Sequence, residues 1–288
     1  TLYQLCNNYS VKGKCRCPVV KIFDYPNMKL RGISDDVSRG QIATIEGFKH
    51  FISELARFKL NHYYIYIEDV FEFASHPKIG QDGALTPDDI KILEKFARKK
   101  FVTISPIFES LGHMDNILSL KGYNKYAEFP GSDCLNVSDP SIYEFLNDLY
   151  TDLCKTFSSP YFHVGCDESW ELGTYKSREY ISEKGEDTVY LEHYKKLYSM
   201  AKKLGKEHII LYSDIAQKFE SVLNNLPSEY ILMYWDYSTG DKEGNFPKMD
   251  IVADSGHPFI VSPAVHDWAR FYPDFTQMEH NTKNIIKY

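Results

Sequence analysis

The feature that most constrains the fold of this chain is the alternation of short apolar runs with amphipathic segments. The apolar runs are rich in aromatic and β-branched residues, as strands are, and polar or aromatic side chains follow them. Strands that alternate with helices indicate a parallel sheet, and polar residues at the carboxyl ends of the strands are typical of a (β/α) barrel. The seven runs that we interpret as barrel strands cover 29–36, 63–67, 101–104, a segment that starts at 161, 208–212, 230–234 and 259–261.

Apolar residues recur at helical spacing between these runs. One helix is expected to begin at Thr86, because Thr is a capping residue, Pro87 stands at the first helical position and acidic residues fill the first turn. The third strand is expected to be broken by Pro106, and a long insertion covers 121–140. Other helices are expected at 44–58, 141–157, 189–204 and from 281 onward.

Seven strands are one fewer than a closed barrel needs. An unpaired parallel edge is costly in a buried barrel. We therefore expect a TIM-type (β/α)8 barrel, and either one strand has escaped the sequence pattern or the eighth strand is absent from the given chain. Residues 1–27 are expected to form an irregular lead-in with a short strand-like piece at 19–24, and residues 28–288 are expected to form the barrel domain. A length of 288 residues fits one large domain of this kind.

Composition excludes several classes of function. The net charge of −7 argues against a nucleic-acid partner, which would call for a basic face. No apolar run reaches the ~20 residues of a transmembrane helix, so we expect no membrane partner. The chain begins at Thr1 without an initiator Met or a signal-like segment. The compartment and the oligomeric state stay open.

The six cysteines do not form a regular framework. Cys6, Cys15 and Cys17 cluster near the N-terminus, but Cys15-Arg16-Cys17 lacks the spacing of a zinc knuckle. No second Cys or His pair accompanies it. We therefore expect neither a metal nor a cofactor.

The run that starts at Tyr161 reads YFHVGCDESWELG and ends in two adjacent carboxylates, Asp167 and Glu168. In a parallel barrel the catalytic residues lie at the C-terminal ends of the strands, and here a buried strand ends in a pair of carboxylates. The alternative is an ion pair between these carboxylates and a neighbouring base. His163, two residues before Gly165, is expected to be structural and to hold the loop that carries the acids.

Polar and aromatic residues at the ends of the other strands are expected to converge on the same face of the barrel. Carboxylates accept hydrogen bonds from hydroxyl groups, and the face of a Trp ring contacts the C–H face of a sugar, so the set suits an uncharged polyhydroxyl ligand. Each residue also has a structural interpretation, such as an ion pair of Arg31 with Asp36, or a loop cap in the case of Asp69. The residues are Arg31, Asp36, Glu68, Asp69, Glu109, His113, Asp214, Trp235 to Tyr237, and His266 to Trp268.

The string H-x-G-x-D-E, formed by His163, Gly165, Asp167 and Glu168, resembles the signature of family 20 glycoside hydrolases, the β-N-acetylhexosaminidases. The GCDE string followed by ELG is similar to the hexosaminidase D-like branch. RGISDDVSRG resembles the family's first-strand motif R-G-x-x-x-D-x-x-R. The segments YIEDVF, ESLGHM, FPGSDCLNVSDP and YWDYS also resemble this branch or family, and the resemblance extends over nearly the whole chain from about Val20. The resemblance favours an eighth strand that is absent from the given chain, because the family has a further strand after the segment where this chain ends.

The resemblance implies an exo-acting retaining β-N-acetylhexosaminidase that removes terminal β-linked GlcNAc or GalNAc by substrate-assisted catalysis. Glu168 would be the general acid and base, and Asp167 would orient the substrate's acetamido group. Arg31 would bind the outer hydroxyls of the sugar, Trp235 would wall the acetamido pocket, and Trp268 would partly replace the aromatic platform that the family's last strand provides. The candidate substrate-binding residues are Arg31, Asp69, His113, Trp235, Tyr237 and Trp268.

Two alternatives stay open. One is a non-catalytic N-acetylhexosamine-binding barrel, which the absent strand suggests. The other is a two-carboxylate retaining glycosidase that pairs Glu168 with Glu109 or Asp214 and cleaves sugars without an N-acetyl group. The adjacency of Asp167 and Glu168 favours the substrate-assisted mechanism, because neighbours on one strand end cannot straddle a sugar as acid and nucleophile. The sequence does not rank GlcNAc against GalNAc or define the linkage.

Overall fold

The computed structural model of the chain describes residues 2–80, 82–266 and 271–288. The chain divides into two compact units, Thr1–Arg31 and Gly32–Tyr288. We describe each of them by itself.

The N-terminal unit contains a helix, α1 (Leu2–Asn8), and a small antiparallel hairpin of β1 (Ser10–Val11) and β2 (Lys14–Cys15). The expectation of a wholly irregular segment is therefore wrong for residues 2–15. Residues 16–31 contain no helix or strand, so the strand-like piece expected at 19–24 is also wrong. Val19 and Phe23 are fully or almost fully exposed, and β-branched or aromatic residues alone do not make a strand without a neighbour to pair with.

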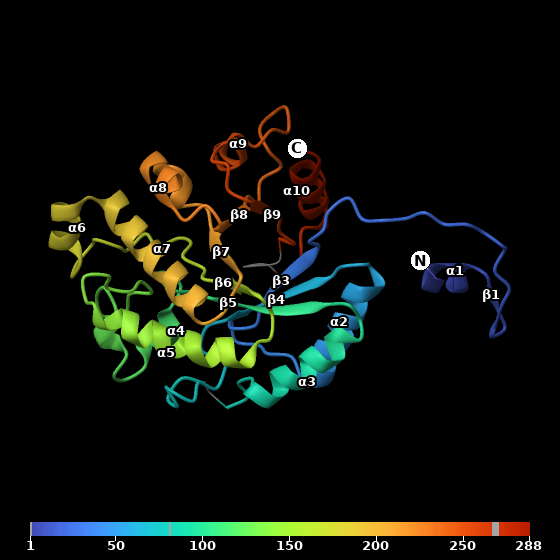
Figure 1. The fold of residues 1–288 in the computed structure, drawn as a ribbon, viewed down its shortest axis with the longest axis horizontal. Coiled ribbons are helices and arrows are strands. Elements are labelled where there is room, and N and C mark those ends of the chain that lie inside the picture. The colour runs from blue at the N-terminus through green and yellow to red at the C-terminus, as the bar shows by residue number, and fades with distance from the viewer. Residues whose placement is uncertain (1, 81, 267–270) are drawn as a thin grey trace. The chain divides into compact units, whose positions relative to one another are not determined.

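The second unit is built on one sheet of seven parallel strands, and all seven strands that the sequence predicted are present (Figure 1). The strands pair in chain order, so each hydrogen-bonds to the next. In the described ranges the first and last strands are each paired on one side. The strands are β3 (Gly32–Asp36), β4 (His62–Ile67), β5 (Thr103–Phe108), β6 (Tyr161–His163), β7 (His208–Tyr212), β8 (Ile231–Trp235) and β9 (Phe259–Ser262).

Strand β5 continues through Pro106 to Phe108, so the expected break at this proline is wrong. Pro106 fits an extended backbone but has no N–H to donate. β5 is registered with β4 along its whole length, whereas it pairs with β6 only between Ile107 and His163. The sparse pairing on the β6 side accommodates a residue that lacks a donor.

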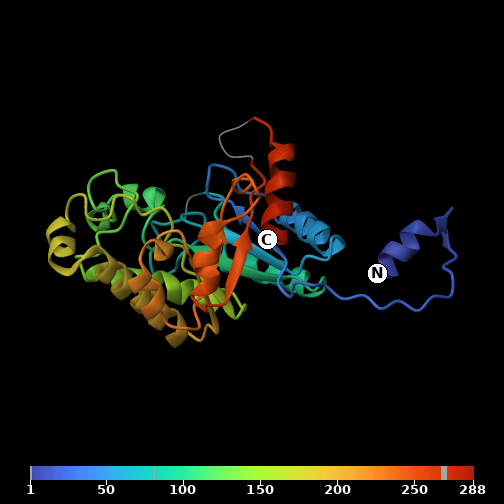
Figure 2. The same ribbon diagram turned by 90° about the horizontal axis from the view of Figure 1, so that it is seen from above.

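Helices surround the sheet, as Figures 1 and 2 show for the second unit. Thr86 begins a helix as expected: its Oγ accepts a hydrogen bond from the Asp89 N–H at 3.1 Å, and its own N–H donates to the Asp89 carboxylate at 2.9 Å. None of the helices within the described ranges is long and apolar enough to cross a membrane. The helices are α2 (Ile45–Arg57), α3 (Pro87–Arg98), α4 (Asp115–Ser119), α5 (Ser141–Thr156), α6 (Arg178–Lys184), α7 (Glu186–Lys203), α8 (Glu220–Asn225), α9 (Pro247–Asp254), α10 (Phe275–Lys287) and the 3₁₀ turns Asn124–Tyr126 and Ala216–Lys218.

The two faces of the sheet bury different kinds of residue. Alternate strand residues such as Ile65, Phe162 and Leu211 join a hydrophobic core with the helices. The residues between them are buried inside the curled sheet, where rings of neighbouring strands contact each other, as His163 and Tyr212 do with centroids 4.2 Å apart. The inner layer contains His62, Tyr64, Tyr66, Ser105, Ile107, His163, Ile210, Tyr212 and Met233.

Candidate active site

The inward-facing side chains of the sheet continue past the strand ends as polar residues. Glu68, Glu109, Asp214 and Tyr237 each lie two residues beyond an inward-facing residue of β4, β5, β7 or β8. Because successive residues of an extended chain alternate sides, this spacing aims them at the same mouth of the barrel. Burial raises the pKa of both Glu109 and Tyr237, and the nearby charge of Asp167 adds to the rise in each case, as expected for groups that lie close together.

The loop after β6 has an unusual backbone. Gly165, Cys166 and Glu168 all have positive φ angles, of 67°, 74° and 45°. A non-glycine residue in this region costs roughly 1–2 kcal/mol. Two buried carboxylates hold the loop in this form: the Cys166 N–H donates to Glu109 Oε2 at 2.7 Å, and the Glu168 N–H donates to Asp214 Oδ2 at 3.0 Å.

His163 is structural, as expected. Its Nδ1 accepts a hydrogen bond from the Gly165 N–H at 3.0 Å, so the imidazole fastens the start of the loop. Burial lowers the pKa of His163 to about 3, which keeps the ring neutral and able to accept. Two glycines allow the surrounding loops to approach: a Cβ on Gly165 would lie 2.3 Å from the Glu109 carboxyl, and one on Gly112 would lie 2.8 Å from the Asp167 carbonyl oxygen.

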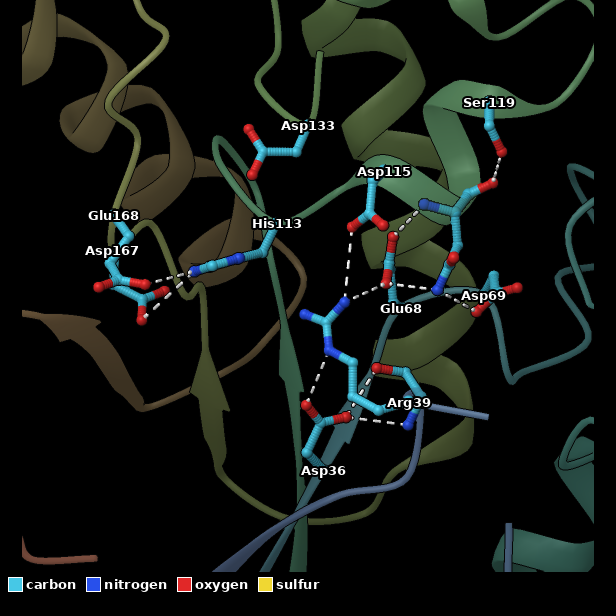
Figure 3. Close-up of polar contacts among 12 residues, drawn as sticks. Asp36, Arg39, Glu68, Asp69, His113, Asp115, Ser119, Asp133, Asp167 and Glu168 are labelled. Atoms are coloured by element: carbon cyan, nitrogen blue, oxygen red, sulfur yellow. Dashed lines mark hydrogen bonds and ion pairs between the residues drawn. The ribbon is translucent and has the colours of Figure 1, made fainter. Parts of the chain in front are cut away.

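The two predicted catalytic carboxylates lie beside the predicted His113 (Figure 3). Nε2 of His113 is 3.3 Å from Glu168 Oε2 and 4.0 Å from Asp167 Oδ2. The Glu168 side chain is 41% exposed and the Asp167 side chain is 17% exposed. Oδ1 of Asp167 is buried, and the Asp167 and Glu109 carboxyl groups are hydrogen-bonding neighbours. A solvent-accessible carboxyl group thus stands next to a mostly buried one.

Burial sets the protonation of this carboxylate cluster. It raises the pKa of Asp167 to about 7, with His113 acting in the opposite direction and Asp214 and Glu168 adding to the rise. Burial likewise raises the pKa of Asp214 to about 6. The pKa of Glu109 is well above its ordinary value, first because of burial and then because of the charge on Asp167. Glu109, Asp167 and Asp214 therefore hold their protons to higher pH than ordinary carboxyl groups do, as groups in acid–base sites often do.

Asp69 lies at the end of β4, where it is buried and takes part in holding a loop. Its Oδ1 accepts a hydrogen bond from Asn116 Nδ2 at 3.3 Å. The neighbouring Glu68 accepts from the Asn116 N–H at 2.7 Å and from its Nδ2 at 2.8 Å, and burial raises the pKa of Glu68 to about 8. These contacts tie the end of β4 to the start of α4. A role of Asp69 in substrate binding stays a prediction.

Arg39 is a charged residue of the mouth that sequence reasoning missed. Its guanidinium extends among Asp36, Glu68 and Asp115, at distances of 3.2, 3.6 and 3.5 Å (Figure 3). The sequence contains a signal for this residue, because Arg39 is the last residue of the motif R-G-x-x-x-D-x-x-R. Only the first Arg of that motif was assigned a role.

Arg31, the predicted sugar-binding residue, is the last residue of the N-terminal unit. Its guanidinium donates to the carbonyl groups of Met28 at 2.5 Å and Lys29 at 3.0 Å. Its role at the sugar stays a prediction.

Trp235 and Tyr237 form a stacked aromatic pair at the end of β8, with ring centroids 5.0 Å apart and an interplanar angle of 28°. Burial and the nearby charges of Asp167 and Glu168 raise the pKa of Tyr237, so its hydroxyl stays protonated and can donate. The structure thus brings both residues to the acidic mouth. Trp268, the other predicted aromatic residue, lies outside the described residues.

Trp170 is a second residue that was not singled out, although it stands in the same string as the acids. Its side chain is 60% exposed, and Nζ of Lys218 lies 3.6 Å from its ring centroid. A cation over a ring face is a favourable contact that fixes the orientation of the indole. The loop therefore presents a large aromatic side chain to solvent two residues after Glu168.

Comparison with known proteins identifies the family of this chain. Residues 28–287 match the family model described as "Glycosyl hydrolase family 20, catalytic domain". Among similar curated proteins, beta-hexosaminidase A of Caenorhabditis elegans is 27% identical, and the match covers 84% of this chain and 47% of that protein. A chitooligosaccharidolytic beta-N-acetylglucosaminidase of Ostrinia furnacalis is 24% identical over 84% of this chain and 45% of its own length. The chain thus spans about half the length of the curated relatives it matches.

Similar solved structures confirm the fold class. The chitobiase of Flavobacterium johnsoniae superposes with a TM-score of 0.70 at 24% identity, over 84% of this chain and 39% of that one. A β-N-acetylhexosaminidase of Bacteroides fragilis gives a TM-score of 0.71 at 19% identity, over 88% of this chain and 55% of its own. The curled seven-stranded sheet is therefore part of a TIM-type (β/α)8 barrel, as the strand–helix alternation predicted.

Proposed function

The chain belongs to glycosyl hydrolase family 20, and we propose that its barrel is the catalytic domain of an exo-acting retaining β-N-acetylhexosaminidase. The proposed substrates are glycans that end in β-linked GlcNAc or GalNAc. The chemistry is assigned to the loop after β6 and to the acetamido group of the substrate itself.

The observation that carries this proposal is the position of Asp167 and Glu168 as neighbours at one strand end, both at the barrel mouth. A retaining pair of acid and nucleophile flanks the sugar, with the carboxyl groups about 5–5.5 Å apart. Adjacent residues of one loop cannot flank a ring. They can serve two groups on the same side of it, namely the glycosidic oxygen and the 2-acetamido group.

In the proposed first step, Glu168 gives its proton to the glycosidic oxygen while Asp167 accepts a hydrogen bond from the acetamido N–H. The mostly buried Asp167 carboxyl group directly beside the accessible Glu168 supports this role, because it can accept the N–H of a group that binds next to the cleaved bond. The acetamido carbonyl oxygen forms a bond to the anomeric carbon as the bond to the leaving oxygen breaks. The product of the step is a cyclic oxazolinium-type intermediate and a free alcohol.

In the second step, water attacks the anomeric carbon and gives its proton to the carboxylate of Glu168. The bond between the anomeric carbon and the acetamido oxygen breaks, so the acetamido group is restored and the β configuration is retained. His113 supports Glu168 in both steps, because its Nε2 at 3.3 Å keeps the carboxyl group oriented. Each turnover thus returns the proton to Glu168.

The stacked pair of Trp235 and Tyr237 is assigned to the acetamido pocket. An indole face suits the acetamido methyl group, and the Tyr237 hydroxyl can donate to the carbonyl oxygen as charge develops there. Asp69, Arg31 and Trp268 remain candidates for the hydroxyl groups and the ring face of the sugar.

Two features oppose the two-carboxylate alternative. Glu109 is 1% exposed, and its Oε2 is occupied by the Cys166 N–H beneath Gly165. Asp214 is 8% exposed, and its Oδ2 accepts the backbone N–H of Glu168. Both carboxylates are buried and use one oxygen each to hold the catalytic loop, which opposes a role as the nucleophile on a bound sugar.

The test is hydrolysis of chromogenic β-GlcNAc, β-GalNAc and plain β-glucoside by the wild-type chain and by Glu168→Gln and Asp167→Asn. We expect cleavage of the N-acetyl sugars only. Glu168→Gln removes a proton donor and should lower kcat by about 10²–10⁴-fold, the usual worth of a general acid. Asp167→Asn should also impair turnover, because the amide can no longer act as an anionic acceptor for the acetamido N–H.

Cleavage of the β-glucoside at a similar rate would contradict acetamido participation, and undiminished turnover of Glu168→Gln would remove that residue from the mechanism. Binding of GlcNAc without cleavage of any substrate would instead support the binding-only barrel.

A further inference from the structure

Three thiols converge in the N-terminal unit. Sγ atoms of Cys6, Cys15 and Cys17 all lie within 4.8 Å of one another, and those of Cys15 and Cys17 are 3.1 Å apart. Cys6 is half-buried, whereas Cys15 and Cys17 are exposed. The spacing of Cys15 and Cys17 alone did not predict a metal site, because the third thiol comes from a helix nine residues earlier.

The local fold explains this convergence. Lys12 and Gly13 have φ angles of 50° and 76°, the signature of a two-residue turn that suits the twist of a tight hairpin. The hairpin pairs Cys15 with Ser10, which lies two residues after the end of the helix that carries Cys6. The chain reversal is held further by the Arg16 N–H, which donates to the carbonyl of Tyr9 at 3.2 Å. Residues two apart on an extended chain face the same side, so Cys17 joins Cys15.

We propose that Cys6, Cys15 and Cys17 form a binding site for a thiophilic d¹⁰ cation, with Zn²⁺ as the ion it takes. Zn–S bonds of about 2.3 Å in tetrahedral geometry place the sulfur atoms about 3.8 Å apart. The observed separations, from 3.1 Å to at most 4.8 Å, bracket this value, so small side-chain movements bring all three sulfur atoms to one ion.

The chemistry of the surroundings supports three thiolate ligands. Among the described residues, the group of possible ligands consists of these three cysteines, and an all-sulfur donor set selects soft cations over Mg²⁺ or Ca²⁺. Each thiol releases its proton on binding, and three thiolates with one Zn²⁺ carry a net charge of −1. The basic residues that flank the thiols compensate this charge. They are Lys12, Lys14 and Arg16.

Three protein ligands leave the fourth tetrahedral position of the ion open to water or to another ligand. The site therefore resembles an exchangeable or accessory metal site more than a closed structural one. It lies in the unit that precedes the barrel strands, and its existence does not depend on the proposed hydrolase function.

The experiment uses the full 288-residue chain, reduced and stripped of metal. Titration with Cd²⁺ should produce the ultraviolet charge-transfer absorption of Cd–thiolate bonds and saturate at one ion per chain. Equilibrium dialysis should then give one Zn²⁺ per chain. Each of Cys6→Ser, Cys15→Ser and Cys17→Ser should weaken binding by more than the roughly 10–100-fold that loss of even an outer-shell partner costs. Cys154→Ser is the matched control and should bind as the wild type does, because this thiol lies outside the cluster.

Thiol alkylation of the wild-type chain gives a second measurement that needs no variant. Bound Cd²⁺ should protect Cys6, Cys15 and Cys17 together, as peptide mapping by mass spectrometry would show. Zinc uptake that is unchanged in Cys15→Ser would overturn the proposal. The absence of the charge-transfer band would also overturn it. A third contrary outcome is a Cys15–Cys17 disulfide that re-forms after reduction, because Cys6 would then be the only thiol left and the chain would take up no metal.

Discussion

Gly165 is the residue on which the geometry of the catalytic loop depends most directly. Its φ of 67° is one that side-chain-bearing residues rarely adopt, and the space where a Cβ would stand is filled by the Glu109 carboxyl at 2.3 Å. Glu109 cannot simply move aside, because its Oε2 binds the Cys166 N–H of the same loop. One glycine thus allows a buried carboxylate to pack directly beneath the backbone that carries Asp167 and Glu168.

We predict that Gly165→Ala costs about 3 kcal/mol or more of unfolding free energy and lowers kcat, because both backbone strain and overpacking apply. Gly122→Ala is the matched control: its φ is 101°, but nothing lies within 4 Å of the added methyl group. It should cost only the strain, about 1 kcal/mol, and leave kcat unchanged. Urea denaturation and initial rates measure both effects. Equal costs for the two variants would show that the contact with Glu109 is unimportant.

At the scale of the elements, a row of amide side chains on helix α10 holds the loop after β8 by hydrogen bonds. Gln277, Asn281 and Asn284 are spaced four and three residues apart, so they share one face of the helix. Their side-chain N–H groups donate to backbone carbonyl groups of residues 236–239 at 2.6–3.1 Å. Oδ1 of the fully buried Asn281 also accepts the Ala264 N–H at 2.9 Å, which ties in the loop after β9. This row positions the segment that contains Tyr237.

Asn281→Ala should therefore destabilise the protein by about 2–4 kcal/mol, since it leaves buried backbone groups on two loops without partners. It should also raise KM for N-acetyl substrates, because the loop that carries Tyr237 is released. Asn224→Ala provides an exposed helical Asn as control and should change stability by less than about 0.5 kcal/mol. Thermal unfolding measures the stability of both variants, and substrate kinetics measure their KM. A stability loss without any change in KM would mean that α10 does not position the pocket.

At the scale of the whole molecule, two groups of buried ionisable residues have opposite effects on how the unfolding free energy depends on pH. Carboxyl groups with raised pKa values bind more protons folded than unfolded, so their contribution to stability declines as pH rises towards the folded pKa. Buried His residues with lowered pKa values bind fewer protons folded, so stability falls as pH drops below their unfolded pKa of 6.5. The carboxyl groups are Glu68, Glu109, Asp167 and Asp214, and the imidazoles are His62, His163 and His193.

Below about pH 6.5 the carboxyl groups and the imidazoles change the unfolding free energy in opposite directions. Above this pH only the carboxyl groups change it, since the pKa is about 7 for Asp167 and about 8 for Glu68. We predict that the unfolding free energy is nearly flat on the acidic side and falls on the order of 1 kcal/mol or more per pH unit between about pH 6.5 and pH 8. Urea denaturation across this range measures the slope.

Glu109→Gln is the control for this effect, because the amide oxygen still accepts the Cys166 N–H while the ionisable group is removed. Its stability curve should be shallower than that of the wild type above about pH 6.5. A wild-type stability that rises with pH in this window would contradict the assignment of raised pKa values to the mouth.

The sequence by itself determined the features that depend on local pattern. Strand–helix alternation identified all seven strands and the parallel barrel, and Thr86 marked a helix start, because apolar periodicity and capping act over a few residues. The adjacency of Asp167 and Glu168 at a strand end located the acidic loop, and His163 was identified as its anchor. Where local pattern had no partner to act on, as at residues 19–24, the prediction failed.

The tertiary structure alone decided what depends on residues far apart in the chain. Sequence placed Glu109 at a strand end, but only the packing of β5 against β6 shows that it lies beneath Gly165 and holds the loop. The amide row of α10, the contacts of Arg39 and the third thiol of the cysteine cluster are likewise formed by folding. Hydrogen bonds, burial and pKa values depend on distances in space, and no spacing along the chain specifies them.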